Sequence, residues 1–264
     1  MKARLMTPHR LAAGLALLLL AACGRPAGAY HSSQASADQA AGYAAPPLVL
    51  SAQRVGDQVV IDGHADPDAR LRLQAPQGQA FGGTAGADGG WSMPAPMNGA
   101  PAVYAVGEEQ GDQILRAEGY VAAFPLGRPA ALLRAGAGSL ALGGPPQALA
   151  IGAVDYDQAG WAFVSGQAPV GASLRLQVDG AAPTEVKADA HGRFSLGFKP
   201  AELPPGAHRL LLMSPTRSAT AAIVIAPAGP ISGAAFQARR EGAAWRVDWS
   251  TPGGGVQTSL ILDP

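Results

Sequence analysis

Short stretches in which apolar and polar residues alternate dominate the chain from about residue 48 onward. In 70–74 and in 173–177, leucines alternate with arginine, serine or glutamine. This period of two is typical of a β-strand with one buried face. Turn sequences such as Asp88-Gly89 and His191-Gly192 interrupt the stretches at intervals that suit a β-sandwich. We therefore predict an all-β fold.

The chain contains two copies of one unit. Leu71-Arg72-Leu73-Gln74 recurs unchanged as Leu174-Arg175-Leu176-Gln177, and in the same register Trp91 corresponds to Phe194. We predict two tandem sandwiches, residues 48–125 and 148–227, with Trp91 and Phe194 filling their cores. Arg72 and Arg175 occupy equivalent outward positions. They are interpreted as solubilising residues, the alternative being repeated contacts to an anionic glycan or acidic partner.

Two segments lie outside the repeats. Residues 126–147 are too apolar for a free linker, and we expect them to pack along a domain edge or between the domains. In the tail, 228–264, apolar Trp245 and Trp249 alternate with polar residues such as Arg246. This pattern predicts a β-hairpin, preceded by a strand near Phe236.

An isolated hairpin is only marginally stable in water, so the tryptophan face must cover something. Either the tail docks on the second domain, or it pairs with a partner or a second copy by strand addition. Under the second alternative, Trp245, Arg246 and Trp249 form an interaction surface. Solvent exposure of both tryptophans would favour carbohydrate binding.

The N-terminus has the pattern of an export signal. Three basic residues and no acidic ones precede the apolar stretch 11–22, which is shorter than the roughly 20 residues that span a bilayer. Small residues at its end then precede Cys23, which is the only cysteine of the chain. We predict a signal peptide over residues 1–22. Residues 23–47, rich in Ala, Ser, Gly and Gln, are predicted to be a flexible tether.

Leu20-Ala21-Ala22-Cys23 resembles the lipobox of bacterial lipoproteins. The resemblance implies that Cys23 becomes the lipidated first residue of the mature chain. Anchoring through Cys23 would place the protein in the cell envelope, and Gly24 favours the outer membrane, with the periplasmic or surface face left open.

The second repeat resembles the bacterial Ig-like domain family. The resemblance is carried by Gly166-Gln-Ala-Pro-Val-Gly-Ala172 and Asp189-Ala-His-Gly-Arg-Phe-Ser195. The first repeat departs from the pattern, with Asp68 in place of the second glycine. Members of this family serve as spacers, stalks or binding modules, so the resemblance implies a non-catalytic role.

Charge and composition restrict the kinds of binding partner and of secondary structure that we expect. The chain has 19 basic and 19 acidic residues, and removal of the signal peptide, with its three basic residues, leaves a net charge of −3. Nucleic-acid binding requires clustered Lys and Arg, which the chain lacks. Many glycines and prolines, 35 and 23, with 6% aromatic residues, favour short strands over long helices.

The histidines and aspartates that could bind a metal or act in catalysis are better explained as residues of surface turns. His64, Asp66 and Asp68, with Asp62 nearby, lack the spacing of a calcium loop. His191 and His208 have no nucleophile motif beside them. We therefore predict no catalytic residue, metal or cofactor.

These observations predict a membrane-anchored envelope lipoprotein that acts as a structural or protein-interaction module. The alternative is a carbohydrate- or peptidoglycan-binding lipoprotein. The sequence leaves the partner and the oligomeric state open.

Overall fold

The computed structural model describes residues 44–144, 148–228, 231 and 234–264. The predicted signal peptide, Cys23 and most of the tether lie outside these residues. Within the described part every regular element is a β-strand, which confirms the predicted all-β fold. The same part contains no helix with the length and hydropathy needed to cross a membrane.

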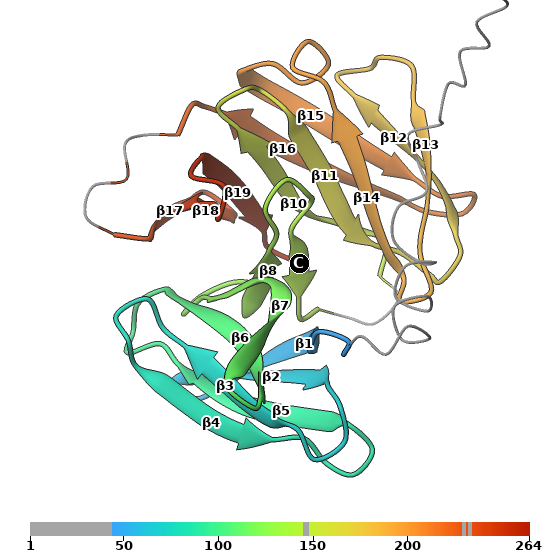
Figure 1. Ribbon diagram of the computed structural model, residues 1–264. Helices are drawn as coiled ribbons and strands as arrows, with labels where there is room; N and C mark the ends of the chain where they lie inside the picture. Colours follow the sequence, from blue (N-terminus) through green and yellow to red (C-terminus); the bar gives the residue numbers. More distant parts are fainter. Residues whose placement is uncertain (1–43, 145–147, 229–230, 232–233) are drawn as a thin grey trace, which may run out of the picture. The chain divides into compact units, whose positions relative to one another are not determined.

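The first repeat forms a sandwich of two antiparallel sheets (Figure 1). One sheet has the order β1-β2-β5 and the other β4-β3-β6-β7-β8-β9. The strands are β1 (Leu48–Val55), β2 (Gln58–His64), β3 (Arg70–Gln74), β4 (Ala80–Thr84), β5 (Gly90–Pro96), β6 (Ala102–Gln110), β7 (Gln113–Ala123), β8 (Ala130–Leu133) and β9 (Leu140–Leu142).

The second repeat forms another sandwich, and the tail extends one of its sheets. The sheets have the orders β14-β11-β10-β19-β18-β17 and β13-β12-β15-β16. The strands are β10 (Ala150–Asp157), β11 (Ala162–Gln167), β12 (Ser173–Val178), β13 (Thr184–Lys187), β14 (Arg193–Phe198), β15 (Gly206–Met213), β16 (Ser218–Ile225), β17 (Phe236–Glu241), β18 (Ala244–Ser250) and β19 (Val256–Leu262).

The two sandwiches repeat each other strand for strand. The sheet order β1-β2-β5 corresponds to β10-β11-β14, and β4-β3-β6-β7 corresponds to β13-β12-β15-β16. Even the irregularity is duplicated, because the first strand of each repeat shifts register at the same place, between Val49 and Ser51 and between Ile151 and Ala153. The structure therefore bears out the duplication seen in the sequence.

Each core is closed by the aromatic side chain that the repeat predicts. Trp91 is 5% exposed and Phe194 is 3% exposed. Each ring lies against a glycine of the preceding repeat motif, Gly63 or Gly166. A Cβ atom at Gly166 would lie 2.0 Å from the carbonyl oxygen of Ala150 and 2.8 Å from the Phe194 ring. The glycine is thus required for the ring to sit close to the backbone.

Replacement of Gly166 by alanine is expected to destabilise the second sandwich by about 3 kcal/mol, because the added methyl group overpacks a closed core. The matched control is Gly253→Ala, where a Cβ atom would meet nothing within 4 Å. Urea unfolding of the two variants measures the difference. Equal stability of both would show that the contact between Gly166 and Phe194 is unimportant.

The two segments outside the repeats both contribute strands. Residues 126–147 contribute β8 and β9, which continue the larger sheet of the first sandwich beyond β7. The tail contributes the predicted hairpin, β18 and β19, and the predicted strand at Phe236, β17. The tail docks on the second repeat through its backbone, because β19 pairs with β10. Its tryptophan face, which was expected to be covered by the second domain, is covered by the first sandwich instead.

Candidate functional site

The apolar face of the tail packs on the first sandwich. Trp245, Val247 and Trp249 belong to one buried cluster with residues of β6, β7 and β8, such as Leu133, and with Phe124 directly after β7. The Trp245 ring stacks on Phe124 with centroids 5.3 Å apart, and the Trp249 ring meets Tyr120 edge to face at 5.9 Å. The tail therefore joins the two sandwiches within residues 45–264, which form one compact unit.

This packing corrects the expectation of an exposed interaction surface. Trp245, Arg246 and Trp249 are 6%, 1% and 3% exposed. The reason is that β19 adds the tail to a sheet of the second sandwich, and both faces of β18 and β19 are then covered. Neither indole ring is open to a sugar.

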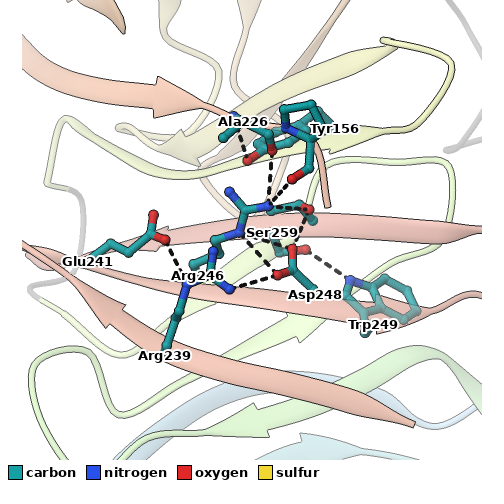
Figure 2. Close-up of polar contacts among 10 residues, drawn as sticks. Tyr156, Ala226, Arg239, Glu241, Arg246, Asp248, Trp249 and Ser259 are labelled. Atoms are coloured by element: carbon teal, nitrogen blue, oxygen red, sulfur yellow. Dashed lines mark hydrogen bonds and ion pairs between the residues drawn. The ribbon is translucent and has the colours of Figure 1, made fainter. Parts of the chain in front are cut away.

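Arg246 lies on the opposite face of β18 from the tryptophans (Figure 2). Its Nε donates to both carboxylate oxygens of Asp248 at 3.1 Å, and a terminal nitrogen donates to the carbonyl oxygens of Ala226 and Pro227 at 3.0 and 3.1 Å. Its guanidinium also lies 5.8 Å from the centre of the Tyr156 ring. Arg246 thus fastens the end of the second repeat to the tail.

A second polar cluster surrounds the buried carboxylate of Asp155 on β10. Its oxygens accept hydrogen bonds from the backbone and hydroxyl of Ser139 at 2.6 and 2.5 Å, and from the Ser259 hydroxyl at 2.5 Å. Gln257 donates at 3.3 Å and also reaches the carbonyl oxygen of Arg134. Asp155 therefore ties the loop between β8 and β9 to β19.

Burial raises the pKa of Asp155, and the hydrogen bonds from Ser139, Ser259 and Gln257 oppose this rise. A carboxyl group whose pKa is higher in the folded chain stabilises folding more as pH falls. Its ionisation costs stability as the pH rises from the unfolded value through the raised folded value.

We expect the stability of the wild-type chain relative to Asp155→Asn to increase as the pH is lowered through this range. Urea unfolding at a series of pH values measures the difference. Asp179 and Asp263 have lowered pKa values, so their contributions to stability decrease as the pH falls. Both contributions are present in the wild type and in the variant, so they cancel in the difference. A constant difference at every pH would contradict the prediction.

The candidate histidines have structural partners. His208 is buried, with Nδ1 2.7 Å from a carboxylate oxygen of Asp179 and Nε2 2.6 Å from the carbonyl oxygen of Pro204. Both ring nitrogens are therefore engaged within the second sandwich. His191 lies in an exposed turn where its backbone N–H donates to Asp189.

The aspartates of the first repeat do not converge with His64. Asp62 accepts hydrogen bonds from Ser51 and Ser92, and His64 contacts the carbonyl oxygen of Asp88. In the described part of the chain, no three His, Cys, Asp or Glu side chains come together as metal ligands.

The structure also contains a groove that the sequence did not predict. It has a volume of about 350 Å³ and lies where the first sandwich meets the start of β17. Its lining includes side chains that are far apart in the sequence: Gln74, Ala105, Arg116, Tyr120, Phe236 and Trp249. In the sequence, only the alternation of residues 70–74 indicated an outer sheet face, and nothing local indicated that the tail would form a wall beside it.

The fold defines a class: an all-β protein with two tandem β-sandwiches. No protein-family model and no curated protein matches the chain.

Among solved structures, the chain is similar to a segment of two fibronectin type-III domains from chicken tenascin, with 14% identity, 69% of this chain and 100% of that chain covered, and a TM-score of 0.22. It is also similar to the central fibronectin-III array of RIM-binding protein, with 13% identity, coverage of 79% and 74%, and a TM-score of 0.25. A third similar structure is the human OSCAR ligand-binding domain, with 16% identity, coverage of 68% and 97%, and a TM-score of 0.21.

Proposed function

We propose that the protein is a lipid-anchored envelope protein that acts as a non-catalytic protein-interaction module. The observation that carries the proposal is the joint between the sandwiches, in which the tail provides a common apolar cluster. Two domains fixed in this way present their outer surfaces as one body. The lipobox-like sequence ending in Cys23 supports attachment of that body to a membrane by acyl chains.

The anchor is tested by Cys23→Ala. In cells fed an alkyne-bearing fatty acid, the variant is expected to lose the lipid label and to leave the membrane fraction, because the acylated thiol is gone. The control Gly24→Ala keeps the cysteine and is expected to keep the label. Undiminished labelling of Cys23→Ala would refute lipidation at this residue.

The interaction role is tested by crosslinking in intact cells. Photoreactive residues are placed at exposed apolar positions on both sandwiches, Leu126, Val170 and Val224, which are 66%, 62% and 57% exposed. A recurrent adduct with an envelope protein from at least one site supports the module. No protein adduct from any site argues against it.

A further inference from the structure

The groove lies on the outer face of the first sandwich, where the corresponding face of the second sandwich serves as an internal reference. Arg72 pairs in register with Gly107, and its duplicate Arg175 pairs with Met213. By the same register, Ala105 corresponds to Leu211. The first sandwich therefore has two small residues where the second has large ones. Ala105 leaves space that the groove occupies, whereas the position beside Gly107 is filled by the Ile114 side chain.

The neighbouring strand, β7 in the first copy and β16 in the second, also carries different side chains on this face. Across from Ala105, β7 carries Tyr120 where β16 carries Thr220. One step further, Arg116 corresponds to Ser218. The first copy has thus gained an aromatic side chain and a cation at the wall of the groove.

The residue directly opposite the duplicated arginine is acidic in the second copy but not in the first. Glu185 on β13 lies directly opposite Arg175, whereas Gly82 lies opposite Arg72. A Cβ atom at Gly82 would meet nothing within 4 Å. On this face the first copy therefore combines extra space at Ala105 with an arginine, Arg72, that has no acidic residue directly opposite it, although Glu109 lies opposite Arg70.

The cations at the groove lack internal partners. Arg116 is the only charged residue in the lining, and its side chain makes no hydrogen bond or ion pair with the described residues. A smaller adjoining hollow shares Arg116 and adds Arg72, whose buried Nε has no partner there either. By contrast, Arg240 on the nearby edge strand is paired with Asp263. The groove is thus complementary to a carboxylate.

The backbone beside the groove is that of an edge strand. Among the described strands β17 pairs only with β18, and Ala235 and Phe236 at its start line the groove. The outer side of an edge strand presents N–H and C=O groups that can pair with an added strand. Pockets beside such an edge select the side chains of the added peptide.

We propose that the groove binds an extended acidic peptide segment of a partner protein, which pairs with β17 and places a carboxylate side chain at Arg116 and Arg72. An apolar side chain of the same segment fills the space over Ala105, between Tyr120 and Phe236. This inference deepens the proposed function and rests on it. It assigns the partner class: a polypeptide with alternating apolar and acidic residues.

The test selects a displayed library of random peptides on the purified full chain. Enriched sequences are expected to combine Asp or Glu with an apolar residue at a fixed spacing. Their affinity is then measured by fluorescence polarisation for Ala105→Leu and Arg116→Ser, which copy the residues of the second sandwich. Both variants are expected to bind at least about tenfold more weakly. Arg175→Ser, at the duplicated arginine, is expected to bind as tightly as the wild type.

Two results would overturn the proposal. One is selection that yields no acidic peptide, or peptides that bind Ala105→Leu and Arg116→Ser undiminished. The other is binding of uronic-acid oligosaccharides, sensitive to the same two variants, in place of peptides, which would assign the groove to an acidic glycan. Thermal unfolding of each variant shows whether it is still folded, so that a loss of binding can be attributed to the groove and not to unfolding. Because this test uses the purified chain, its failure is separate from failure of crosslinking or anchoring in cells.

Discussion

A chain that lacks residues 230–264 is expected to lose stable folding of the second sandwich and of the joint. The deletion removes Trp245 and Trp249, which are buried against the first sandwich. Truncation of one buried tryptophan costs about 3–5 kcal/mol. Two such losses are comparable with the total stability of a typical domain, about 5–15 kcal/mol. The deletion also removes Ser259 and Gln257 from the buried carboxylate of Asp155.

The deletion is measured by thermal unfolding together with binding of a dye that reports exposed apolar surface. We expect a lower unfolding temperature and increased dye binding. Single variants refine the result: Trp249→Ala is expected to be strongly destabilised, whereas Trp161→Ala, whose side chain is 48% exposed, is the matched control and is expected to change little. A deletion variant that melts like the full chain would show that the tail is dispensable for folding.

The second large effect is expected at Arg246. Its replacement by alanine leaves the Asp248 carboxylate, which is 2% exposed, without the cation on its own strand. Breaking a buried ion pair on one side costs about 3–5 kcal/mol. Thr258 and Arg239 still donate to Asp248, so we expect a value near the lower limit.

Urea unfolding measures the loss, with two comparisons. Arg239→Ala is the comparison, because Arg239 pairs with the same carboxylate but its side chain is 51% exposed, so a smaller loss than for Arg246→Ala is expected. The double variant Arg246→Met with Asp248→Leu removes both charges and is expected to recover most of the stability. If Arg246→Ala and Arg239→Ala are equally stable, the buried pair does not hold the tail in place.

The sequence predicted the repeated unit well because its determinants are local. Alternation around Leu71 and Leu174 defines strands, and a glycine facing Trp91 or Phe194 marks the core. These features depend on residues within one repeat, so the duplicated copies reveal them twice. The equivalent topology of the two sandwiches confirms the prediction.

The role of the tail could not be predicted from its alternation alone. Arg246 and Asp248 alternate with tryptophans and therefore resemble the solvated face of a strand. In the structure they are buried because they compensate each other and bond to Thr258. A period of two separates the faces of a strand but does not distinguish a face covered by water from one covered by paired charges.

The groove was equally hidden, for a different reason. Its walls come from segments more than one hundred residues apart, such as Ala105 and Phe236. The sequence placed Arg72 correctly on an outward face, yet the duplicate Arg175 made a solubilising role the simplest interpretation. Only the register between neighbouring strands shows that Gly82 and Glu185 occupy the same place in the two copies.

The position of β19 also sets an order of assembly. It lies between β10 and β18, so the edge of β10 stays open until residues 256–262 have emerged. A polypeptide made from its N-terminus folds domain by domain, and an unpaired strand edge is prone to aggregation in the meantime. Any chain that stops short of β19 keeps that edge exposed. Strand β19 thus makes maturation of the second sandwich conditional on synthesis of the chain through residue 262.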